Sequence, residues 1–139
     1  MPIVSAANAP RLGFEKAMRP TYDELTSGDT TAAPFRTMKD LFLLAACRGY
    51  QLGERRPLEA RESPIHWEVL SEQVDIPILK ALAIAATGDI TVLLRPDEIA
   101  RIAEEYANTG IRDLHYVLID QPGQALWNLV DLIREIMEI

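Results

Sequence analysis

Residues 34–58, PFRTMKDLFLLAACRGYQLGERRPL, contain the most apolar helix predicted in the sequence and end in a basic, turn-rich tail. Thr37 is a good N-cap, and Asp40 three residues later can complete a capping box. Apolar residues follow at helical spacing and cover most of the helix circumference: Met38, Leu41, Phe42, Leu43, Leu44, Ala45 and Ala46. A helix that is apolar nearly all round is buried on several sides. The helix at 37–48 is therefore predicted to be central and to end at Gly49.

The flanking sequence predicts further helices, which are amphipathic or rich in alanine. They are expected at 21–25, 76–87, 96–107, 111–119 and 124–138. Two short segments are expected to be extended: residues 65–70 form a short strand or a single helical turn, and residues 90–94 form a strand or an extended connector. The predicted fold is all-α, a single compact domain of five or six helices over 21–139. Residues 1–20 are expected to form a flexible N-terminal arm, and the helices at 76–87 and 124–138 to pack against the central one.

Composition sets limits on the class of protein. A chain of 139 residues is the size of one domain, and with 48% apolar but only 6% aromatic residues its core must be mainly aliphatic. One cysteine allows no internal disulfide. The first residues lack the apolar run and cleavage site of a signal peptide, and no stretch is apolar enough to span a membrane. We expect a cytoplasmic protein with no membrane partner.

The charge is divided unevenly along the chain. The net charge is −7, yet residues 1–63 carry nine Lys/Arg against eight Asp/Glu, whereas residues 64–139 carry five against thirteen. The acidic second half repels phosphate, so any contact with nucleic acid is expected to use the first half.

Motifs that carry chemistry are missing from the sequence. It has no P-loop, no GxGxxG after a predicted strand, no HExxH and no GxSxG, so we assign no catalytic, metal or cofactor-binding residue and expect no cofactor. Several potentially reactive side chains are predicted to have structural or solvent-exposed roles. Cys47 is predicted to fill the core, and His66 and His115 to be structural. The pair Glu104–Glu105 and the acidic ridge of Asp131, Glu135 and Glu138 are predicted to be solvated.

Basic residues at the two ends of the 37–48 helix are the one electrostatic feature that suggests an outside partner. Arg55 and Arg56 follow the helix, and Arg36 and Lys39 lie at its start. Arginine forks suit phosphates and carboxylates, so these four residues are the predicted contacts for a partner protein or DNA. The alternative is that they pair with the acidic half of their own domain.

The sequence also resembles a known family. The blocks PFRTMKDLFLLAACRGYQLGERRPL, HWEVL, ALAIAATGDITVLL and EEYANTGIRDL are similar to Dnd system-associated proteins, over about residues 21–135. Proteins of this family are encoded beside bacterial genes for DNA phosphorothioation, in which sulfur replaces a non-bridging phosphate oxygen. The family has no assigned reaction, so the resemblance implies a setting, DNA modification and the restriction that accompanies it, more than a mechanism.

Three functions follow from these observations. The first is a non-enzymatic accessory or adaptor protein of a phosphorothioation-linked defence system, which contacts other proteins of that system, with DNA as a further contact. The second is a small DNA-binding transcriptional regulator that works as a homodimer. The third is a metal-dependent nuclease that uses the acidic half, although no ligand spacing supports it.

Overall fold

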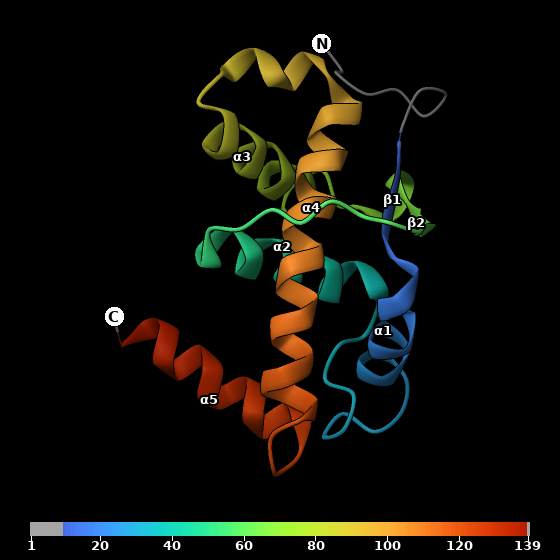
Figure 1. The fold of residues 1–139 in the computed structure, drawn as a ribbon, viewed down its shortest axis with the longest axis vertical. Coiled ribbons are helices and arrows are strands. Elements are labelled where there is room, and N and C mark those ends of the chain that lie inside the picture. Colours follow the sequence, from blue (N-terminus) through green and yellow to red (C-terminus); the bar gives the residue numbers. More distant parts are fainter. Residues whose placement is uncertain (1–9, 139) are drawn as a thin grey trace.

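The computed structural model describes residues 10–138 and is built around helix α4, Pro96–Leu114, which runs through the middle of the molecule (Figure 1). Helix α2, Met38–Leu52, crosses α4, while α3, Asp75–Thr87, and strand β1, Arg11–Glu15, pack on it as well. The prediction that the helix at 37–48 is the centre was therefore wrong. α4 is longer, and its buried face extends over its whole length through Ile99, Ile102, Ala103, Tyr106, Ala107, Ile111 and Leu114.

The start of α2 lies where the sequence predicts it. Thr37 is the N-cap, its hydroxyl accepts the Asp40 backbone N–H at 3.4 Å, and it donates to the Asp40 carboxylate at 2.8 Å. The end of α2 was predicted wrongly, because the helix continues past Gly49 to Leu52. Gly53, with φ of +77°, is the left-handed residue that caps it.

Gly49 and Gly110 serve the crossing of α2 and α4 and do not end helices. A Cβ atom built on Gly49 would lie 1.9 Å from the carbonyl oxygen of Tyr106, and one on Gly110 would lie 1.7 Å from the carbonyl oxygen of Ala45. The backbones of the two helices therefore touch on both sides of the crossing. The break predicted at 108–110 is absent, and α4 continues to Leu114 and into a π-helical turn, His115–Ile119.

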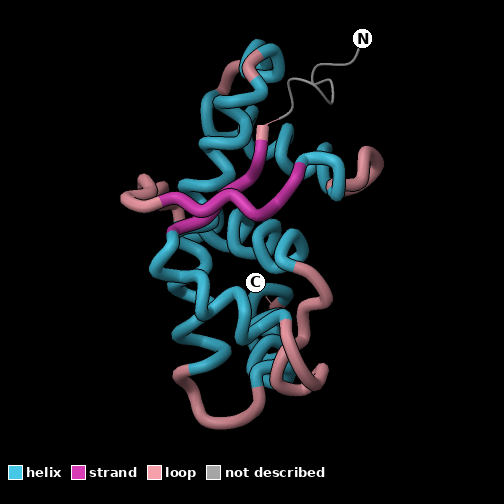
Figure 2. Tube along the Cα trace, turned by 90° about the vertical axis from the view of Figure 1, so that its right-hand side faces the viewer, coloured by secondary structure: helices cyan, strands magenta, loops and turns pink. Residues whose placement is uncertain are grey.

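The fold is mostly helical, as predicted, but it is not purely all-α. Strand β2, Arg61–His66, pairs with β1 in an antiparallel two-stranded sheet, and the pairs Leu12–Ile65 and Phe14–Glu62 flank an irregularity in the register (Figure 2). Short strands of this kind carry a weak sequence signal, since β2 contains Pro64 and two charged residues, Arg61 and Glu62.

The predicted flexible arm is wrong where the structure describes it. Residues 1–9 of that arm lie outside the described residues, but Arg11–Glu15 form β1 and residues 16–18 a 3-10 turn. Leu12 and Phe14 are buried, and the Phe14 ring stacks on Tyr22 with 4.0 Å between the ring centres. Tyr22 belongs to helix α1, Arg19–Thr26, so the strand anchors the first helix to the core.

The remaining elements follow the sequence more closely. α3 ends at Gly88 as predicted and packs on both α2 and α4. Of the two ambiguous segments, 65–70 is the end of β2 followed by a 3-10 turn, and 90–94 is a 3-10 turn and not extended. Helix α5, Ala125–Met137, packs chiefly on the 115–119 turn and leans away from the body, so its predicted docking on α2 was wrong (Figure 1).

Candidate functional site: the strap and the ion pairs of α4

The segment after α2 is a strap, residues 53–60, that crosses α4 and leads into β2 (Figure 1). Three hydrogen bonds hold its backbone on the helix. The Arg56 N–H donates to the carbonyl oxygen of Glu105 at 3.0 Å, and the Asn108 amide donates to the carbonyl oxygens of Arg56 and Pro57 at 3.1 and 3.3 Å. Asn108 is almost fully buried, so it fixes the strap instead of ending α4.

Arg55 turns inward to α4. Its guanidinium donates to the Glu105 carboxylate at 2.9–3.0 Å and lies 5.8 Å from the centre of the Tyr106 ring. Arg101, one turn before Glu105, lies 3.5 Å from the same carboxylate. With 13% of its side chain exposed, Glu105 is not the solvated residue that was predicted.

Glu104 is buried as well and joins α4 to both strands. One carboxylate oxygen accepts the Gly13 N–H at 2.8 Å and an Arg61 N–H at 2.5 Å, and the other accepts the Arg61 Nε–H at 3.1 Å. The Glu104 side chain is 6% exposed. The prediction of a solvated pair at Glu104–Glu105 was therefore wrong for both members, because each carboxylate neutralises an arginine that the chain brings to it.

Two more basic residues near α2 have partners within the domain. The Lys39 ammonium lies 2.5 Å from the Asp75 carboxylate, which also accepts the Ser71 N–H at 2.8 Å. The Arg48 guanidinium lies 2.6 Å from the Asp113 carboxylate on α4. For Arg55 and Lys39 the structure thus contains the internal pairing that the sequence left open.

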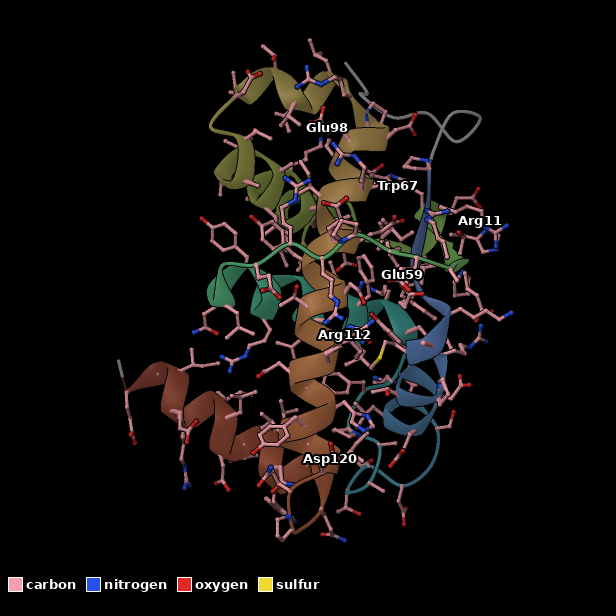
Figure 3. The ribbon with its side chains drawn as sticks, in the orientation of Figure 1. Arg11, Glu59, Trp67, Glu98, Arg112 and Asp120 are labelled. Carbon is pink, nitrogen blue, oxygen red and sulfur yellow. The ribbon has the colours of Figure 1, made fainter. Side chains whose placement is uncertain are left out.

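Arg36 and Arg56 differ from the other predicted contacts, since both are exposed and neither has a carboxylate within 4 Å among residues 10–138. The charge of Arg56 is still felt at Glu15. Burial alone would raise the pKa of the Glu15 carboxyl, but the N–H groups of Glu59 and Ala60 and the charges of Arg112 and Arg56 bring it below its usual value. Figure 3 shows Glu59 on the strap and Arg112 on α4.

A cleft of about 500 Å³ opens beside the strap, between β1 and the first half of α4. Its lining includes the apolar residues Pro57, Leu58 and Ala100. It also includes three arginines and three carboxylates: Arg11, Arg61, Arg101, Asp97, Glu104 and Glu105. Four of these six charged groups already pair with one another. Figure 3 shows Arg11 at the sheet and Glu98 near the start of α4, at the outer limits of this region.

Two buried carboxyl groups with lowered pKa values make the stability of the fold sensitive to acid. The pKa of Asp75, like that of Glu15, is lowered despite burial, by Lys39 and the Ser71 N–H. The unfolded chain therefore binds protons first as the pH falls below the ordinary values of 4.5 for Glu and 3.8 for Asp. The stabilisation is complete above that window and is lost as the pH falls through the folded pKa values.

We expect a Glu15→Gln/Asp75→Asn variant to unfold more easily than the wild type at pH 7 and to lose less further stability between pH 5 and pH 3. Urea unfolding at each pH, followed by circular dichroism, measures this. If the free energy of unfolding fell equally with pH in the two proteins, these carboxylates would not be the cause of the acid sensitivity.

The histidines and the cysteine have separate environments. His115 Nδ1 forms a hydrogen bond with the Thr21 hydroxyl at 2.9 Å, and His115 Nε2 lies 3.3 Å from the Asp120 carboxylate. His115 therefore connects α1 to the turn that follows α4. His66 is exposed beside Arg11. Cys47 was predicted to fill the core and is instead exposed on α2. In the described part of the chain no group of three or more His, Cys, Asp or Glu side chains is placed to hold a metal ion.

These elements define a small, mostly helical domain whose ion pairs fasten the strap and a two-stranded sheet to one central helix. Residues 14–135 match the model of the family described as DNA sulphur modification system-associated protein 4, and the chain belongs to this family. This confirms the resemblance to Dnd system-associated proteins. No curated protein and no solved structure matches the chain. Over residues 10–138, none of the helices is long and apolar enough to cross a membrane.

Proposed function

We propose that the chain is a non-enzymatic accessory protein of a bacterial DNA sulphur modification system and that it works by contact with other proteins of that system, with DNA as a further ligand. The family match over most of the chain carries this proposal. The associated system modifies DNA, and a domain of this size contributes to such a system most simply by binding one of its components.

The use of the buried carboxylates supports a binding role over a catalytic one. Glu104, Asp75 and Glu15 are each buried, and each carboxylate accepts at least two hydrogen bonds from donors of the chain itself. A general base or acid needs a carboxylate that is free to reach a substrate proton. These three groups stabilise the fold instead.

Of the four predicted contacts, Arg36 and Arg56 have the most freedom to meet an external carboxylate or phosphate. Arg55 and Lys39 remain candidate contacts, but a partner would have to compete with Glu105 and Asp75 for them. An exposed guanidinium pays less desolvation on binding than one taken from a buried pair. We therefore assign the leading contact to Arg36 and Arg56.

The experiment co-expresses the tagged chain with the other proteins of the sulphur modification system and separates complexes by size-exclusion chromatography. We expect Arg36→Glu/Arg56→Glu to weaken the complex about tenfold or more, since two favourable charges become repulsive. Lys16→Glu/Lys80→Glu, an equal charge change at two other basic residues outside α5, is the matched control and is expected to leave the complex intact.

Labelled duplex DNA is titrated in parallel at rising salt. Direct DNA contact is expected to give an affinity that falls with salt and with the Arg36→Glu/Arg56→Glu change. Complexes and DNA binding that are both unaffected by the double variant would remove these residues from the contact surface. Turnover of DNA by the purified chain would contradict the non-enzymatic role.

A further inference from the structure

The charged groups that line the cleft between β1 and the first half of α4 differ in exposure. The Glu104 and Glu105 side chains are 6% and 13% exposed, whereas those of Arg61 and Arg101 are 43% and 56% exposed. Arg11 on β1 is exposed as well. A group that enters the cleft therefore meets guanidinium N–H donors before it reaches these two carboxylates, although the lining holds three arginines and three acids.

Arg101 is only a secondary partner of the carboxylates beside it. Its guanidinium lies 3.5 Å from Glu105 and 3.6 Å from Glu98, which are long distances for an ion pair. Each of these carboxylates has a closer arginine, Arg55 at 2.9 Å and Arg95 at 2.7 Å, respectively. A ligand can therefore take N–H donors of Arg101 without leaving either glutamate unpaired.

Arg11 also keeps its positive charge available to a ligand. Its Nε–H donates to the carbonyl oxygen of Ser63 at 2.9 Å, and a terminal nitrogen lies 3.4 Å from the His66 ring. Neither group carries a negative charge that would neutralise the guanidinium. Arg61 differs, because its donors already bind Glu104, the Ser63 hydroxyl and the Arg11 carbonyl oxygen. The cleft thus offers two available cations, one on β1 and one on α4.

The rest of the lining favours an anion that is attached to an apolar group. Asp97 is the one exposed acid of the lining, and it lies in the first turn of α4, where the helix dipole offsets part of its charge. Pro57, Leu58 and Ala100 supply apolar surface. A DNA backbone would present a row of phosphates to a chain of net charge −7 and leave this apolar surface unused.

We propose that the cleft binds a short acidic segment of a partner protein, in which carboxylates flank an apolar side chain. The carboxylates accept N–H donors of Arg11 and Arg101, and the apolar side chain covers Leu58 and Ala100. Arginine forks match carboxylates in geometry as well as in charge. This inference rests on the proposed role in protein contact, but it concerns other side chains than those of Arg36 and Arg56.

The probe is a fluorescein-labelled peptide of nine residues with a central Leu and an Asp on each side of it, in a background of Gly and Ser. One control peptide carries Asn in place of each Asp, and another carries Ser in place of Leu. Binding to the full chain is measured by fluorescence anisotropy at low salt. We expect the Asp peptide to bind about tenfold or more tightly than the Asn peptide, and about threefold or more tightly than the Ser peptide.

Variants of the cleft test which residues bind the peptide. Arg11→Gln/Arg101→Gln is expected to weaken binding of the Asp peptide about tenfold or more, because both available cations are lost. Lys16→Gln/Arg134→Gln removes two charges at exposed residues outside the lining, and its affinity is expected to stay within about twofold of the wild type. Asp97→Asn is expected to tighten binding about twofold or more, a gain that misfolding does not produce.

Four results would overturn the proposal. Two of them are equal binding of the Asp and Asn peptides, and binding that Arg11→Gln/Arg101→Gln leaves unchanged. Displacement of the labelled peptide by a short duplex DNA at a lower concentration than by unlabelled Asp peptide would assign the cleft to phosphate. Self-association of the free chain in sedimentation that the same double variant abolishes would assign it to a second copy.

The peptide assay also separates this inference from the proposed function. Absence of peptide binding, with the complex still lost in Arg36→Glu/Arg56→Glu, would remove the acidic segment and keep the proposed contact. Peptide binding as expected, with the complex unaffected by that change, would keep the cleft site and remove the contact assigned to Arg36 and Arg56.

Discussion

Replacing Gly110 by alanine is expected to lower the free energy of unfolding by about 3 kcal/mol, at the upper end of the range for overpacked cores. The new methyl group would lie 1.7 Å from the carbonyl oxygen of Ala45, a backbone atom that cannot rotate away. α2 and α4 would have to separate along their crossing, which opens voids among side chains that are now close-packed. Urea unfolding followed by circular dichroism measures the change.

The sign of this effect is what makes it informative. In a helix free of neighbours, glycine to alanine stabilises by about 1 kcal/mol, so the contact has to outweigh that gain. Gly49→Ala should behave as Gly110→Ala does, since its methyl group would meet the Tyr106 carbonyl oxygen at 1.9 Å. Glu135→Ala on the exposed face of α5 is the control, expected within about 0.5 kcal/mol of the wild type. A stabilised Gly110→Ala protein would mean that the helices do not touch there.

These glycines also show where sequence patterns are ambiguous. A glycine after an apolar run indicates a helix end, and this is correct for Gly88 and, four residues later than predicted, for Gly53. The same residue inside a helix permits two backbones to touch, as at Gly49 and Gly110. The choice depends on whether another helix crosses at that point, which periodicity along one segment does not contain.

The ion pairs show a different limit. The imbalance of charge between the two halves of the sequence correctly left open that the arginines pair with the chain's own acids. It did not indicate which acids, because Arg61 and Glu104 are 43 residues apart and Arg48 and Asp113 are 65 apart. The pair of adjacent glutamates at 104–105 led to the prediction that Glu104 is solvated. Its burial follows from β1 and β2, two short strands whose own sequence signal is weak.

The position of α4 at the centre has a similar cause. The prediction of a buried helix at 37–48 rested on its apolar content and was correct in that α2 is buried along much of its length. However, centrality depends on how many elements a helix meets, and the 19 residues of α4 reach α2, α3 and the sheet. The incorrectly predicted helix end at 108–110 divided α4 into two short helices, so the number of elements that it contacts was underestimated.

Replacing Glu104 by alanine is expected to destabilise the protein by about 3 kcal/mol. The change removes the partner of Arg61 and leaves the Gly13 N–H without an acceptor, and an unpaired buried donor costs about 1–3 kcal/mol. Breaking a fully buried ion pair costs about 3–5 kcal/mol, but Arg61 is 43% exposed and regains water, which reduces that part of the loss. Thermal and urea unfolding measure the total.

A set of variants separates the two contributions. Glu104→Gln keeps an acceptor for the Gly13 N–H and should lose about 1–2 kcal/mol less than alanine. Arg61→Ala leaves the carboxylate with one donor, so the double variant should lose less than the sum of the single losses by about 1 kcal/mol or more. Asp23→Ala, which breaks an exposed pair with Arg19, is the control and should cost about 0.5 kcal/mol at most. Additive losses would mean that Glu104 holds the sheet through the Gly13 N–H alone and that its ion pair with Arg61 contributes nothing measurable to stability.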